Sequence, residues 1–188
     1  MKAELGRLAS PTLTVGALVI AALACSPSSA ETPPAPASPS IPTPQTFIAL
    51  ADCPITTVTT PYVARPPYLA EPPEYYRLVW HGNDALWTML DPRGEVWAGL
   101  PNNAGSLTQK TWWWSRNFEI ERERSPVITV TGMRLDAPGS FSAGNPGTHA
   151  YADFGTAMLV GVDVPATGCW EIRAEYEGAE LAYVVLVE

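Results

Sequence analysis

The chain has 188 residues, 46% hydrophobic and 16% charged, which is enough for one domain with a hydrophobic core and too little for two large ones. Twenty prolines and fourteen glycines leave few places for long helices. Nineteen acidic and eleven basic residues give a formal net charge of -8. Because a negative protein repels the phosphate backbone, the charge disfavours binding to nucleic acids.

The N-terminus has the pattern of a bacterial export signal. After a short basic region, residues 13–24 form a largely apolar run of twelve residues, whereas about 20 are needed to span a bilayer. The run ends at Cys25 and resembles a lipobox, in which a small residue precedes a cysteine that becomes lipidated. We therefore predict a lipoprotein signal peptide over 1–25 and a lipid on Cys25, with ordinary cleavage after Ala30 as the alternative. In both cases we expect export, and in the first a lipid anchor that leaves the domain on the extracytoplasmic side.

Residues 26–46 are predicted to be a disordered tether. Seven of these 21 residues are proline and five are serine, so the segment cannot bury apolar surface and favours extended polyproline II. A single domain is expected over 47–188. A second proline-rich stretch, 61–73, contains tyrosines and aliphatic residues, and we expect it to be an ordered, irregular loop that lies over the domain.

Within the domain, short segments rich in β-branched and aromatic residues are separated by turn signals. Residues 91–94, of sequence DPRG, have the composition of a type I turn, which predicts a hairpin between 86–90 and 95–98. Further strands are predicted over 110–116, 127–131 and 156–164.

The C-terminal segment gives the clearest strand pattern. In 169–176 apolar residues alternate with charged ones, as in a strand with one buried and one solvated face. Gly178 and Ala179 suit a two-residue turn, and the almost wholly apolar 181–187 is expected to be buried on both faces and central in its sheet. Because no interior segment has a helical period over ten residues, we predict an all-β domain with an immunoglobulin-like antiparallel β-sandwich fold.

The three cysteines favour one disulfide. Lipidation or cleavage removes Cys25 from pairing, which leaves Cys53 and Cys169 as an even pair in an exported protein. A bridge between them closes a loop of about 115 residues, for which chain entropy gives roughly 4–5 kcal/mol. Two free thiols are the alternative, and a metal site lacks the ligand spacing. Because Cys169 shares its strand parity with Glu171 and Arg173, the bridge should fasten the N-terminal segment to the outside or edge of a sheet.

Several short motifs together resemble a family of uncharacterised bacterial exported lipoproteins over about residues 53–188. The motifs are Cys53-Pro54, His81-Gly82-Asn83, Leu86-Trp87-Thr88, Lys110 with Trp112-Trp113, Gly132-Met133-Arg134-Leu135-Asp136, and Gly168-Cys169-Trp170-Glu171. The chain departs from the family pattern at Trp114 and in a charged insert over 119–124. The resemblance implies an exported β-sandwich with paired cysteines, and it brings no activity and no catalytic residues.

No catalytic set is recognisable in the sequence. His81 and His149 are the two histidines, and we expect each to be hydrogen-bonded or solvent-facing rather than a metal ligand. Motifs for a zinc protease, a phosphate-binding loop or a nucleophile elbow are missing from the sequence. We therefore expect no enzymatic activity, no metal and no cofactor.

The seven tryptophans are the only positive sign of a binding surface. On a strand Trp112 and Trp114 point to one side and Trp113 to the other, so one side can be core and the other a platform for sugars or partner surfaces. We expect Trp80, Trp87, Trp97 and Trp170 to fill the sandwich and Trp112 to Trp114 to lie at its rim. The alternative is a binding patch formed by a solvent-facing Trp113 or by the Trp112 and Trp114 pair.

These features support three functional hypotheses in descending order. The first is a non-enzymatic, membrane-tethered extracytoplasmic domain that binds an envelope protein or has a structural role in the envelope. The second is a module that binds cell-wall or surface polysaccharide through exposed tryptophans. The third is a hydrolase, whose most plausible residues are His81 and His149.

Overall fold

The computed structural model describes residues 46–143, 147–152 and 154–188, and this part of the chain consists almost entirely of strands and loops. The predicted signal peptide, Cys25 and the predicted tether up to residue 45 lie outside the described residues. The elements are η1 (Leu50–Asp52), η2 (Glu74–Tyr76), β1 (Val79–Gly82), β2 (Trp87–Leu90), β3 (Val96–Trp97), β4 (Asn102–Asn103), β5 (Ser106–Trp114), β6 (Thr129–Arg134), β7 (Ser140–Ser142), β8 (Thr148–Ala152), β9 (Gly155–Val164), β10 (Gly168–Tyr176) and β11 (Ala179–Val187), where η marks a short 3-10 helix.

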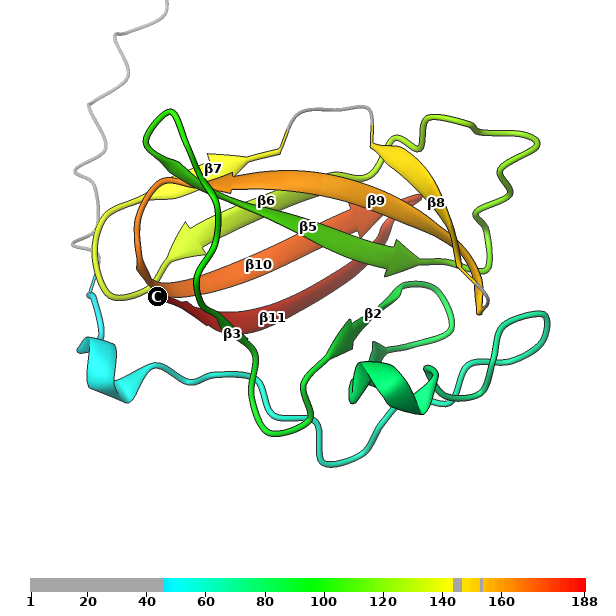
Figure 1. Cartoon of the computed structure of the whole chain (residues 1–188), viewed down its shortest axis with the longest axis horizontal. Helices are drawn as coiled ribbons and strands as arrows, with labels where there is room; N and C mark the ends of the chain where they lie inside the picture. Colours follow the sequence, from blue (N-terminus) through cyan, green and yellow to red (C-terminus); the bar gives the residue numbers. More distant parts are fainter. Residues whose placement is uncertain (1–45, 144–146, 153) are drawn as a thin grey trace, which may run out of the picture. The chain divides into compact units, whose positions relative to one another are not determined.

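Two sheets pack face to face, which confirms the prediction of an all-β sandwich (Figure 1). One sheet has the order β1-β2-β5-β9-β8 with β4 on the side of β5, and the other has the order β3-β11-β10-β6-β7. All pairs are antiparallel except β3 with β11, which run parallel. The finer prediction of an immunoglobulin-like topology stays a prediction.

The inner core lies between the two sheets and follows from strand alternation. In β10 the alternate residues Trp170, Ile172, Ala174 and Tyr176 are buried, and Arg173 between them is exposed. The facing strand β9 contributes valines at every second position to the same cluster. Alternation of this kind places one apolar face of each sheet against the other and removes both from water.

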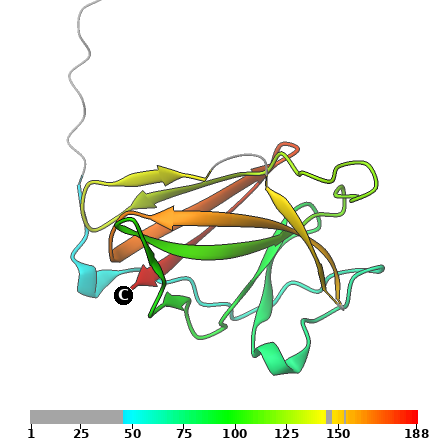
Figure 2. The same ribbon diagram turned by 45° about the horizontal axis from the view of Figure 1, so that its top comes forward.

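A second hydrophobic cluster lies on the outside of the six-stranded sheet, and we call it the outer layer. Its buried members are Ala64, Trp80, Trp87, Trp114, Phe154 and Ala157. The cover over this cluster comes from the proline-rich stretch and η2, which lie outside both sheets (Figure 2). The prediction of an ordered loop over the domain is confirmed, since Tyr68 donates its hydroxyl to the Ser115 carbonyl at 3.0 Å.

The predicted hairpin over 86–98 needs correction. The turn at residues 91–94 forms, with the Gly94 amide donating to the Asp91 carbonyl at 3.1 Å, but it joins strands of different sheets. β2 belongs to the six-stranded sheet and β3 to the other, so the expected hairpin is a crossover. The reason is that β3 pairs in parallel with β11 at Leu186 and Val187, which turns the chain away from β2.

The C-terminal hairpin forms with a loop shifted by one residue. Tyr176 pairs with Ala179, so the loop is Glu177-Gly178, and both residues have positive φ (48° and 77°) as in a type I′ turn. β11 lies between β3 and β10, as its apolar sequence predicts. Its second face is only partly buried, and Thr56 of the N-terminal segment pairs with Val184 along it.

The disulfide between Cys53 and Cys169 is present, with Cα atoms 5.6 Å apart. Cys169 is fully buried although it does not belong to the inner core. Its strand parity is that of the outer face, and the segment around Cys53 covers it there. The bridge therefore fastens the N-terminal segment to the outside of the five-stranded sheet, as the parity predicts.

Candidate functional site

The three consecutive tryptophans do not form an exposed patch. Trp113 points into the inner core and Trp114 into the outer layer, and each has 0% of its surface exposed. The prediction that they alternate in direction is confirmed. A place at the rim is wrong for Trp113 and Trp114, which are fully buried, and so is the alternative of a solvent-facing Trp113. Trp80 and Trp87, expected to fill the sandwich, lie instead in the outer layer. Both sides of β5 are covered, one by the second sheet and one by the proline-rich loop. Only Trp112 keeps partly exposed surface, with its ring stacked over Trp114 at a centroid distance of 6.2 Å.

A cleft of about 260 Å³ opens beside Trp112, where β2 and β5 separate. The two strands pair only at Trp87 with Trp114 and at Thr88 with Trp113. Beyond this point β2 turns toward the crossover at residues 91–95 while β5 continues along β9 (Figure 1). Side chains from the crossover, from β5 and from β11 line the space left between them.

The floor of the cleft is formed by buried or partly buried groups around Glu95. The carboxylate accepts the Trp97 indole N–H at 3.0 Å and the Asp91 amide at 2.9 Å, which fixes its position. Burial raises the pKa of Glu95, and the two hydrogen bonds oppose that shift only in part. Among the described residues Glu95 forms no ion pair with a basic side chain.

Tyr183 reaches the same floor from β11 in the opposite sheet. Its ring packs against Trp97 and Trp113 at centroid distances of 6.5 and 5.8 Å, and 4% of its surface is exposed. Burial and the nearby charge of Glu95 raise the pKa of the Tyr183 phenol well above its usual value, so the hydroxyl stays protonated. That hydroxyl forms no hydrogen bond within the described part of the chain, which leaves it available to a ligand.

The rim of the cleft is aromatic and carries one cation. Tyr76, in η2, is 42% exposed and contacts Phe154 edge-on at 5.4 Å. Trp112 lies on the β5 side, and Lys110 is exposed two residues before it on the same strand. The cleft therefore combines flat apolar surfaces at its entrance with a carboxylate and a phenol at its floor. Such a space suits binding, because hydrophobic walls with a few placed polar groups are typical of ligand sites.

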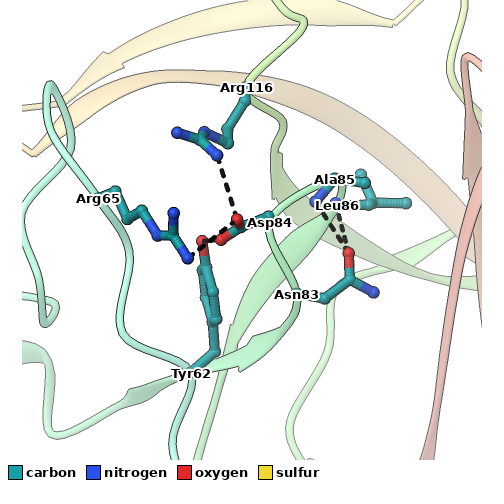
Figure 3. A network of polar contacts seen from close by, with 7 residues as sticks. All are labelled: Tyr62, Arg65, Asn83, Asp84, Ala85, Leu86 and Arg116. Carbon is teal, nitrogen blue, oxygen red and sulfur yellow. Dashed lines mark hydrogen bonds and ion pairs between the residues drawn. The ribbon is translucent and has the colours of Figure 1, made fainter.

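A second polar arrangement is centred on Asp84 in the turn between β1 and β2 (Figure 3). Asp84 accepts the Tyr62 hydroxyl at 2.8 Å and forms ion pairs with Arg116 at 3.1 Å and Arg65 at 3.5 Å. The three partners come from the proline-rich loop and from the loop after β5. All four side chains are engaged with one another, so we assign this network to holding the loop in place rather than to binding.

The histidines lie far apart in the fold. His81 is in β1 and His149 in β8, which are the opposite edges of the six-stranded sheet. His149 Nδ1 is 2.8 Å from the Arg124 carbonyl, and burial lowers the pKa of His81. Over residues 46–143, 147–152 and 154–188, no three His, Cys, Asp or Glu side chains gather as a metal site would require. The same residues contain no helix with the length and apolar character needed to cross a bilayer.

Comparison with protein-family models, with curated proteins and with solved structures finds no match for this chain.

Sequence reasoning missed the cleft, and its residues explain why. Glu95 and Tyr183 are 88 positions apart and belong to segments interpreted as a simple hairpin and a buried strand. One available signal was Glu95 itself, a charged residue directly after the turn at 91–94 and two positions before a tryptophan. The structure places this carboxylate in the cleft that opens where β2 and β5 separate.

Proposed function

We propose that this protein is a non-enzymatic binding domain held by a lipid at the extracytoplasmic side of a bacterial membrane. The sequence that ends at Cys25, which resembles a lipobox, and the proline-rich segment after it support the location. The disulfide between Cys53 and Cys169 supports export, because such bonds persist in oxidising compartments. The observation that carries the binding role is the cleft, in which an exposed aromatic rim leads to the carboxylate of Glu95 and the hydroxyl of Tyr183.

The location is tested by lipid labelling in a bacterial host. The full chain is expressed with a radioactive or clickable fatty acid, and membranes are separated from soluble extract. We expect label on the wild type and none on Cys25→Ala, which should leave the membrane fraction. Equal labelling of both, or a soluble wild type cleaved after Ala30, would contradict the lipid anchor.

The binding role is tested by capture of surface components on the immobilised mature protein. The variant Trp112→Ala removes a partly exposed ring of the rim, and Tyr151→Ala on β8 removes an exposed ring elsewhere as the matched control. We expect a component that Tyr151→Ala retains and Trp112→Ala loses. If both variants retain every component, the cleft is not the binding site.

A second candidate is a glycan-binding module, favoured by the position of Trp112 and Tyr76 at the rim. Exposed aromatic rings stack on the apolar faces of sugars, and the floor offers hydrogen-bonding groups. The test is co-sedimentation with insoluble cell-wall polysaccharide at low and high salt. Salt-resistant pelleting that is lost in Trp112→Ala supports this candidate, and failure to pellet at either salt excludes it.

A further inference from the structure

The charge balance of the cleft points to the kind of group that it binds. Glu95 is a carboxylate at the floor without a basic partner in the described part of the chain. Two N–H donors hold it in place, and each of its oxygens keeps a free lone pair. The Glu95 carboxylate is half-buried, fixed in position and not paired with a basic side chain. The ligand that complements it best is therefore one that carries a positive charge.

The walls around Glu95 suit a cation as well. Trp97 and Tyr183 form the floor beside the carboxylate, and Tyr76 and Trp112 form the rim. Aromatic faces carry negative partial charge and attract ammonium groups, most strongly when water is excluded. Trp97 and Tyr183 are each 4% exposed, so a cation that reaches the floor meets two rings that are shielded from solvent.

The size of the space limits the ligand. A volume of about 260 Å³ is below the roughly 300–1,000 Å³ usual for drug-sized ligands, so the floor accepts a compact group rather than a long chain. Lys110 on the rim is exposed and pairs with no acid among the described residues. A cationic ligand is therefore expected with its charge at the Glu95 end and its neutral part toward Lys110.

We infer that the cleft binds a compact alkylammonium group, held between the carboxylate of Glu95 and the aromatic side chains of Trp97, Trp112 and Tyr183. The inference rests on the proposed binding role of the cleft and names the chemistry of its ligand. An ammonium group of this kind occurs on lipid headgroups, on amino sugars and on free small molecules, and the cleft recognises the group that they share.

The test compares choline with 3,3-dimethylbutan-1-ol, its neutral isostere of the same shape, by calorimetry and tryptophan fluorescence on the mature protein. We expect choline to bind at least about tenfold more tightly, because only the cation gains from Glu95 and the ring faces. Equal affinities would overturn the inference, since the cleft would then select for shape alone. Ethanolamine, titrated in parallel, has the N–H donors that choline lacks and that some lipid headgroups and amino sugars carry. Its affinity relative to choline shows whether these donors strengthen binding.

Variants assign the effect to the cleft. Glu95→Gln should weaken choline binding at least about fivefold and reduce the preference over the isostere, while Glu175→Gln, on the exposed face of β10, should change neither. Tyr76→Ala, at an exposed position that tolerates truncation, should weaken binding about threefold. Lys110→Gln should raise choline affinity, because it removes a like charge from the rim of the cleft. Weaker choline binding in Lys110→Gln, or full binding in Glu95→Gln, would overturn the inference.

The outcome separates this inference from the proposed function. If choline does not bind but the mature protein captures a surface component that Trp112→Ala loses, the alkylammonium inference is wrong and the binding role stands. If choline does not bind and no component depends on Trp112, both are wrong.

Discussion

The inner core and the outer layer are built from the same side chain in two different ways. Each inner tryptophan donates its indole N–H to an acceptor: Trp97 to Glu95, Trp113 to Thr111 and Trp170 to the Ala166 carbonyl. In the outer layer Trp80 donates to the Leu69 carbonyl of the proline-rich loop at 3.1 Å, whereas the indole N–H groups of Trp87 and Trp114 are buried without a partner in the described part of the chain. The acceptors of the inner core come from β5 and from the loops that join its strands, whereas the irregular loop over the outer layer supplies an acceptor for one of three buried indole N–H groups.

The largest expected effect comes from truncating the inner member of the adjacent pair in β5. Trp113→Ala should lower the free energy of unfolding by about 3–5 kcal/mol, because sheets on both sides leave a cavity that cannot collapse. Trp114→Ala should cost at least about 1 kcal/mol less. The outer layer to which Trp114 belongs is covered by an irregular loop that can shift, and the change removes a buried N–H that has no partner in the described part of the chain. Denaturant unfolding of both variants measures the difference.

Both side chains are fully buried in the same strand, so the pair controls for residue type and strand position. A cost for Trp114→Ala as large as that for Trp113→Ala would mean that the proline-rich loop is as rigid as the second sheet.

A backbone contact that holds the loop gives the next largest effect. Gly155 begins β9 with φ of 116°, and a Cβ there would lie 2.5 Å from the Tyr68 ring. Gly155→Ala should therefore cost about 1–3 kcal/mol and speed amide exchange over 61–73. Gly161→Ala on the same strand is the control, because a Cβ there has open space and φ is ordinary. Slow exchange retained in Gly155→Ala would show that the loop is held by other contacts.

The difference between the two regions also explains what the sequence could predict. The alternation in 169–176 and the tryptophan parity in β5 follow from the two-residue period of a strand. The buried face of β10 and the opposite directions of Trp113 and Trp114 could therefore be inferred, but not which side of β5 faces the inner core. The disulfide followed from the number of cysteines, and its place on the outside of the sheet followed from the strand parity of Cys169.

The crossover at 86–98 and the cleft could not be predicted, because they depend on which sheet each strand joins. The DPRG turn is compatible with a hairpin and with a crossover, and only the distant pairing of β3 with β11 decides between them. The exposure of Trp112 likewise depends on where the loop over β5 ends. The end of an irregular loop produces no periodic pattern in the sequence, so it could not be predicted.

A smaller effect is expected at the polar contact that holds the loop over the outer layer. Burial and the hydrogen bond to Asp84 raise the pKa of Tyr62 to about 12, so its hydroxyl donates at all ordinary pH. Tyr62→Phe should cost about 0.5–1.5 kcal/mol, with faster amide exchange confined to the loop. Tyr151→Phe, on an exposed tyrosine of β8, should change neither quantity. Faster exchange throughout the inner core would show instead that the two regions unfold together.

The smallest effect should appear where the two regions meet, at Glu95. Burial raises the pKa of Glu95 in the folded protein, so the folded state binds its proton more tightly than the unfolded chain does. The resulting contribution to stability is complete below the pKa of the unfolded chain and is lost as pH rises through the folded pKa. Glu95→Gln should remove this part of the pH dependence, and Glu175→Gln should leave it unchanged. Unfolding midpoints measured from pH 4 to pH 8 give the slope. If Glu95→Gln does not alter the change of unfolding midpoint with pH, the group responsible lies elsewhere, and Glu95 is not a buried charge at the floor of the cleft.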